Sequence, residues 1–153
     1  MKTLLVYYSR TDVTKKIAKM IQEKINCDIE EITDDDKYSG KLGFLKGGMN
    51  ASMGRTSDIN IISKNPTDYD LIIIGTPVWA SNIATPIYTY LMKYNKDFKN
   101  VASFCTCMGN GYEKTLKNIS EITGKEQIST MFFTAEDIKN PEEKINIFIN
   151  EIK

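Results

Sequence analysis

Histidine is absent from this chain of 153 residues, and cysteine occurs only three times. Without imidazole, catalytic triads that depend on histidine are excluded. The cysteines, at positions Cys27, Cys105 and Cys107, are odd in number and include no CxxC pair, which argues against a disulfide framework and against a zinc site. Any catalysis must therefore come from a bound cofactor or from carboxylates, hydroxyls and tyrosines.

An excess of either charge is also missing, because 20 basic residues balance 20 acidic ones. Proteins that bind nucleic acid normally need a basic face, so nucleic acid is not an expected partner. No apolar run approaches the length that spans a bilayer, and the stretch after Met1 and Lys2 is too short for a signal peptide. We therefore expect a single cytoplasmic domain over residues 1–153, without membrane attachment.

Five short apolar runs predict the strands of a sheet. The third run, Leu71–Ile74, is unbroken and rich in isoleucine, which is typical of a central parallel strand covered on both faces. The others cover residues 3–8, 27–32, 101–106 and 130–134. Because helical patterns separate most of these runs, the sequence predicts an α/β fold with a doubly wound, five-stranded parallel sheet in the order 2-1-3-4-5 and helices on both faces.

The helices have recognisable ends. The first pattern runs through Val13 to Ile25, and the second begins with Thr85 as its predicted N-cap. The third ends at Gly124, and the last begins at Pro141. Residues 34–57 interrupt the rhythm, because they hold five of the nine glycines. We expect a short helix over Leu42–Met53 there, packed on the sheet edge, with a pocket wall or a dimer contact as alternatives.

The loop after the first strand carries three hydroxyl residues, Ser9, Thr11 and Thr14, and leads straight into a helix. Free N–H groups at the start of a helix point at an anion bound there, and the helix dipole favours its negative charge. Ser and Thr hydroxyls donate further hydrogen bonds. The pattern indicates a cradle for the phosphate of a small molecule, with an ordinary capped turn as the alternative.

Two further loops are expected beside this one. In a doubly wound sheet, ligands bind beyond the carboxyl ends of the strands, where the strand order reverses. Residues 76–82 and 107–112 follow the third and fourth strands, so they meet the phosphate loop at that edge.

Segments 9–14 (SRTDVT) and 69–80 (YDLIIIGTPVWA), with weaker support from 104–111 (FCTCMGNG), resemble the flavodoxin family of FMN-binding proteins. The resemblance implies that the hydroxyls of Ser9, Thr11 and Thr14 bind the FMN phosphate. It implies that backbone N–H groups assist them, namely those of Arg10, Thr11, Asp12, Val13 and Thr14. It also implies contacts to the flavin ring from Thr76, Pro77, Val78, Trp79 and Ala80 on one side, and from Cys107, Met108, Gly109 and Tyr112 on the other side and edge.

Two positions depart from the family pattern. The family usually has glycine where this chain has Asp12, and Asp is one of the few other residues that tolerate a positive φ. We expect its carboxylate to turn outward as a helix cap. Flavodoxins often place glycine beside the flavin N5, whereas residues 79–82 contain none; here Asn82 is expected to take the left-handed conformation more easily than Ala80.

Some of these residues also have a simpler interpretation. Trp79, the only tryptophan, is either a ring-stacking residue or a core residue. Cys105 and Cys107 are expected to be small buried residues rather than redox thiols.

The implied function is that of an FMN-binding, flavodoxin-like electron-transfer protein with FMN as its cofactor. Its partners would be a redox protein or a small-molecule acceptor, and a homodimer is left open. One alternative is an FMN-dependent NAD(P)H oxidoreductase that acts on a quinone or another small acceptor. A further alternative is a flavodoxin-like binding module without FMN.

Overall fold

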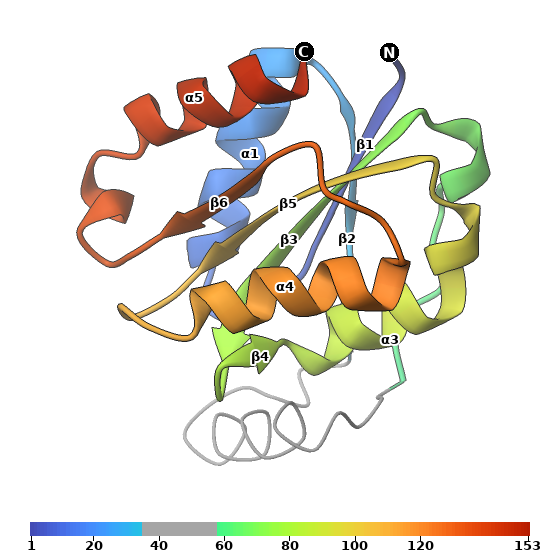
Figure 1. Cartoon of the computed structure of the whole chain (residues 1–153), viewed down its shortest axis with the longest axis horizontal. Coiled ribbons are helices and arrows are strands. Elements are labelled where there is room, and N and C mark those ends of the chain that lie inside the picture. Colours follow the sequence, from blue (N-terminus) through green and yellow to red (C-terminus); the bar gives the residue numbers. More distant parts are fainter. Residues whose placement is uncertain (35–57) are drawn as a thin grey trace.

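The computed structural model describes residues 1–34 and 58–153, which form a parallel sheet with helices on both faces (Figure 1). In this part of the chain the parallel strands are β1 (Thr3–Tyr7), β2 (Asp28–Glu31), β3 (Leu71–Trp79), β5 (Asn100–Thr106) and β6 (Thr130–Phe133). They lie in the order β2-β1-β3-β5-β6, which confirms the predicted doubly wound sheet. The structure adds a short strand, β4 (Asn82–Ile83), antiparallel to the end of β3.

The helices cover the two faces in pairs. They are α1 (Val13–Ile25), α3 (Thr85–Tyr94), α4 (Tyr112–Thr123) and α5 (Glu142–Ile152), with short 3-10 turns at Pro66–Asp68, Asn95–Asp97 and Asp137–Lys139. Side chains of α1 and α5 pack in one core cluster, and side chains of α3 and α4 pack in the other. Figure 1 shows this arrangement, with α1 and α5 above the sheet and α3 and α4 below it. The predicted helix over Leu42–Met53 lies outside the described residues.

The central strand β3 explains why two clusters form. Leu71 and Ile73 face α1 and α5, whereas Ile72 and Ile74 face α3, and all four side chains are fully buried. Alternating side chains on a strand point to opposite faces, so one apolar run supplies both cores. Full burial of such a side chain contributes about 1.5–3 kcal/mol. The prediction of a central strand covered on both faces is confirmed.

Position 75, on the same strand, requires glycine because the Phe104 side chain lies very close to its backbone. It pairs with Phe104 of β5, and a Cβ atom added at Gly75 would lie 2.4 Å from the Phe104 Cζ atom. The Phe104 ring is fully buried against the rings of Phe133 and Phe148. Only glycine leaves room for this ring beside the sheet.

Two helix ends test the sequence expectations. Helix α4 ends as predicted, because Gly124 takes a φ of 65° and donates its N–H to Ser120 O at 2.9 Å. At the start of α3, the prediction that Thr85 is the N-cap is wrong, since Ala84 is the N-cap and Thr85 is the first helical residue. Strand β4 runs to Ile83, so only Ala84 remains between the strand and the helix.

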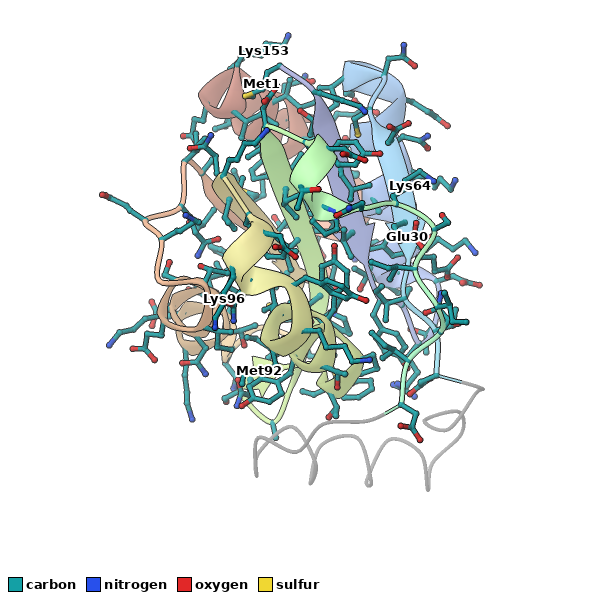
Figure 2. All side chains as sticks on the ribbon, turned by 90° about the vertical axis from the view of Figure 1, so that its right-hand side faces the viewer. Met1, Glu30, Lys64, Met92, Lys96 and Lys153 are labelled. Carbon is teal, nitrogen blue, oxygen red and sulfur yellow. The ribbon has the colours of Figure 1, made fainter. Side chains whose placement is uncertain are left out.

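The chain returns along β2 through residues 58–64. Figure 2 shows Glu30 and Lys64 close together on this edge of the molecule. The Glu30 carboxylate is buried and accepts hydrogen bonds from the N–H and the hydroxyl of Ser63, at 2.9 and 2.7 Å. Lys64 Nζ adds an ion pair at 3.8 Å. These contacts hold the returning segment against β2. Within the described ranges, no helix combines the length and apolar character needed to cross a lipid bilayer.

Candidate phosphate and cofactor site

The three loops predicted to meet at the carboxyl edge of the sheet do meet there. Thr14 and Thr106 are joined by a hydrogen bond of 2.8 Å, which ties the 9–14 loop to the end of β5. A Cβ atom added at Gly111 would lie 2.8 Å from Ser81 Cα, so the β5–α4 loop touches the β3–β4 turn. The sheet order places all three loops beside the switch point between β1 and β3.

The 9–14 loop presents unpaired donors at the start of α1. Lys16 N–H donates to Asp12 O at 3.0 Å as the first helical bond, and Lys15 N–H donates to Ser9 Oγ at 3.2 Å. The N–H groups of Val13 and Thr14 come before these and have no acceptor within the helix. An anion bound at this end would receive both.

The three predicted hydroxyls differ in exposure. Thr11 is exposed, Ser9 is half-buried, and Thr14 is only 2% exposed at the base of the loop. Beside them, Lys15 Nζ lies 3.3 Å from Glu31 Oε2, so this positive charge is already paired. Burial and the Glu31 carboxylate raise the pKa of the neighbouring Tyr7 phenol, which keeps it protonated. Besides the guanidinium of Arg10, the donors of the loop are hydroxyl and amide groups.

Asp12 is the N-cap residue of α1 and takes the expected backbone conformation, but its side chain makes no capping hydrogen bond. Its φ is 64°, which confirms that this position needs a residue tolerant of the left-handed region. The prediction that its carboxylate caps α1 is wrong, because Asp12 makes no side-chain hydrogen bond to the helix. Ser9 Oγ accepts the N–H of Lys15 instead. The exposed Asp12 side chain lines a hollow of about 210 Å³ together with Arg10, Glu31 and Asp34.

Replacing this carboxylate is expected to change phosphate affinity little. Asp12→Asn keeps a residue that tolerates positive φ and removes only the charge. Because the side chain is exposed, solvent screens it, and the affinity for a phosphate-bearing ligand should rise by less than about threefold. Titration of wild type and variant at two salt concentrations measures this. A tightening of about 100-fold would mean that Asp12 faces the phosphate, since that factor is the repulsion expected of a close carboxylate.

The second loop is a tight hairpin rather than an open loop. Ala80 and Ser81 have φ values of 48° and 60°, and Asn82 lies in β4 opposite Trp79. Although Asn82 would take the left-handed conformation more easily, it is Ala80 and Ser81 that adopt it. In a two-residue hairpin turn with positive φ at both central positions, the register assigns that conformation to residues 80 and 81. Holding Ala80 there costs about 1–2 kcal/mol.

Polar contacts fix this hairpin from inside. Thr76 is fully buried, and its hydroxyl donates to Pro77 O at 2.9 Å and accepts the Ala84 N–H at 3.1 Å. Asn118 of α4 donates to Asn82 Oδ1 at 2.8 Å. The hydroxyl of Thr76 thus supports the turn from inside, whereas Ala80 is an exposed residue.

Trp79 belongs to the core in this structure. Its side chain is 6% exposed, and its ring meets the edge of Tyr8 at a centroid distance of 5.3 Å and an angle of 88°. Pro77 and Val78 are half-buried on the same strand. Pro77, Val78 and Ala80 are therefore more accessible to a flat ligand at this edge than the indole face is. Stacking of a ligand on Trp79 stays a prediction.

The third loop offers a mixed surface. Cys107 is half-buried, Met108 is 93% exposed, and Gly109 takes a φ of 139° that only glycine adopts readily. Tyr112 begins α4, and its ring stacks on Phe132 at 3.8 Å and 10°. One face of the tyrosine is thus covered, which sequence reasoning missed because Phe132 lies on a distant strand.

The cysteines show no sign of redox activation. Burial raises the pKa of the fully buried Cys105 thiol, and burial also raises the pKa of Cys107. A protonated thiol is a poor nucleophile, so neither thiol is activated; Cys105 is buried as predicted, whereas Cys107 is only half-buried. Across residues 1–34 and 58–153, no cluster of three or more His, Cys, Asp or Glu side chains is placed to hold a metal ion.

A doubly wound α/β sheet with a hydroxyl-rich loop and a helix N-terminus at its switch point defines a protein built to bind a phosphorylated ligand. A family model described as Flavodoxin matches residues 2–139, and the chain belongs to the flavodoxin family. No curated protein matches the chain.

Solved structures agree with this assignment. The chain is similar to a flavoprotein from Lactobacillus acidophilus crystallised in complex with FMN, at 27% identity over 90% of this chain and 96% of that one, with a TM-score of 0.76. It also shares its fold with the oxidised flavodoxin 1 of Bacillus cereus, at 15% identity, 98% coverage of both chains and a TM-score of 0.56. A WrbA-like flavodoxin from Agrobacterium tumefaciens has the same fold at 14% identity over 97% of this chain and 95% of that one, with a TM-score of 0.60.

Proposed function

We propose that this protein binds FMN at the carboxyl edge of its sheet and passes electrons between redox partners. The observation that carries the proposal is the anion cradle at the start of α1. There the N–H groups of Val13 and Thr14 have no acceptor within the helix. The hydroxyl residues Ser9, Thr11 and Thr14 lie in the same short stretch of the chain. Family membership and the similarity to a flavoprotein crystallised with FMN support the choice of ligand.

The residues present fit FMN by their chemistry. The phosphate is an acceptor, and the loop supplies hydroxyl and backbone N–H donors at the positive end of a helix dipole. The flavin ring is flat and apolar, and Pro77, Val78, Ala80 and the 107–109 segment offer mostly apolar surface beside the cradle. FMN supplies the redox chemistry when bound, whereas the protein supplies binding, orientation and access to the ring.

The chain's own side chains suit this division of work. Histidine is absent, and the thiols of Cys105 and Cys107 stay protonated, so neither offers a reactive group at neutral pH. The partners that exchange electrons with the protein are proposed to be a reductase and an acceptor, either a redox protein or a small molecule.

A flavin titration tests the proposal. Purified apoprotein is titrated into FMN and, separately, into riboflavin, and the quenching of flavin fluorescence is followed. Hydrogen bonds to a charged group contribute about 1.5–3 kcal/mol each, so two of them predict at least about 100-fold tighter binding of FMN than of riboflavin. Equal affinity for both flavins would show that the cradle does not bind the phosphate and would contradict the proposal, whereas binding of neither would favour a binding module without FMN.

A second assay separates a carrier from a reductase. The FMN-loaded protein is mixed with NADH or NADPH and a soluble quinone, with and without an added flavodoxin reductase. If the protein is a carrier, NADH or NADPH is oxidised only when the reductase is present. Rapid oxidation without it would assign the protein to the oxidoreductases instead.

A further inference from the structure

The hydrogen bond between Thr14 and Thr106 lies at the base of the phosphate loop. It joins Oγ1 of Thr14, in the first turn of α1, to Oγ1 of Thr106, the last residue of β5, at 2.8 Å. Both side chains are buried, with 2% and 6% exposure. Neither hydroxyl has a carboxylate partner among the hydrogen bonds of the described residues. Thr106 lies in the 104–111 segment of the family resemblance, where no role was expected of it, yet it contacts one of the three hydroxyls expected to bind phosphate.

The direction of this bond decides what Thr14 offers to an anion. A hydroxyl has one proton to donate and two lone pairs to accept with. If Thr14 donates to Thr106, its proton is used inside the protein and its lone pairs face the ligand. If Thr106 donates to Thr14, the Thr14 proton is free for the ligand. The geometry allows both directions, because either atom can act as the donor.

We propose that Thr106 is a positioning residue for phosphate recognition: it donates its proton to Thr14, so that Thr14 donates its own to the phosphate. The inference rests on the proposed FMN function. A phosphate only accepts hydrogen bonds from this loop, so it selects the direction that points both protons toward it. Hydrogen bonds in such a chain polarise one another, which strengthens the outer one. Thr106 thereby favours flavins that carry a phosphate over those that lack one.

The test compares variants by the ratio of their riboflavin and FMN dissociation constants. Thr106→Val keeps the shape of the side chain and removes the hydroxyl, and it is expected to weaken FMN binding about three- to tenfold with riboflavin unchanged. Thr106→Ser keeps the hydroxyl and should restore the wild-type ratio. Thr123→Val is the matched control, because the Thr123 hydroxyl bonds to Ile119 O at the far end of α4.

A double variant tests whether Thr106 acts through the Thr14 hydroxyl, as a relay would. In a Thr14→Val background, Thr106 has no hydroxyl at position 14 to which it can donate. Adding Thr106→Val should therefore change the FMN dissociation constant by less than about 1.5-fold, as expected for two residues that act through one interaction. If Thr106→Val does not fold, as judged by circular dichroism, Thr106→Ala takes its place in the same comparisons.

The outcomes are distinct. A wild-type protein that does not prefer FMN overturns the proposed function, and the relay with it. A wild-type protein that prefers FMN, with an unchanged ratio in Thr106→Val, overturns the relay alone. An equal loss of FMN and riboflavin binding also overturns it, because that pattern reports general damage to the loop.

Discussion

Gly75→Ala is expected to lower the free energy of unfolding by about 3 kcal/mol, at the upper end of the range for overpacked cores. The added Cβ would lie 2.4 Å from Phe104 Cζ and 2.8 Å from Cε1. The ring has no space to retreat, because Phe133 and Phe148 pack against it. The backbone is equally restrained, since Gly75 O accepts the Tyr8 N–H at 3.2 Å. Urea denaturation of wild type and variant measures the loss.

A second substitution shows whether the ring is the cause. Phe104→Leu removes the atoms that the new methyl group meets, at a cost of its own in lost packing. The double variant should be more stable than the sum of the two single losses predicts, by at least about 1 kcal/mol, because contacting residues are not additive. Additive losses would refute the close approach. So would a Gly75→Ala variant whose free energy of unfolding in urea lies within about 0.5 kcal/mol of wild type, which is the size of a harmless surface change.

Gly111→Ala is expected to cost about 2–4 kcal/mol of stability and to weaken FMN binding at least about tenfold, because it adds both backbone strain and a clash. Gly111 has a φ of 80°, and its Cβ would lie 2.8 Å from Ser81 Cα and 3.0 Å from Val78 Cγ1. Ser81 is itself held at positive φ in the two-residue turn. Neither loop can yield without displacing the surfaces proposed to hold the flavin ring.

Gly124→Ala is the matched control for this prediction. Gly124 also has a positive φ, of 65°, but its added Cβ would meet nothing within 4 Å. It should lose only the strain, about 1–2 kcal/mol, and keep the wild-type FMN dissociation constant. Chemical denaturation and the flavin titration give the two quantities. If Gly111→Ala binds FMN as the wild type does, the contact between the two loops has no part in holding the cofactor.

The sheet could be predicted because its information is local. A run such as Leu71–Ile74 identifies a buried central strand by composition alone, and the alternation with helices then leaves few strand orders. The same holds for the phosphate loop and for Gly124, whose signals lie within a few residues. The sheet and the helix end at Gly124 are confirmed, and the 9–14 loop lies at the predicted edge of the sheet.

The hairpin after β3 escaped prediction for a physical reason. Two-residue turns with positive φ usually contain glycine or asparagine, and Ala80-Ser81 contains neither, so the turn signal was absent. Pro77 is also unfavourable inside a strand, since proline cannot donate to a ladder. The structure accommodates both through contacts from elsewhere, namely Asn118 on Asn82 and the N–H of Ala84 on Thr76. Such support depends on tertiary structure and leaves no local pattern.

Thr106 was missed for the same reason, and its position also affects how the protein folds. It lies 92 residues from Thr14, so the phosphate loop reaches its finished form only after β5 has joined the sheet. Contacts this distant in sequence close late, because the intervening chain must first lose its freedom. We therefore expect a refolding chain to recover phosphate affinity together with its last long-range pairing, which makes ligand binding a reporter of completed folding rather than a template for its start.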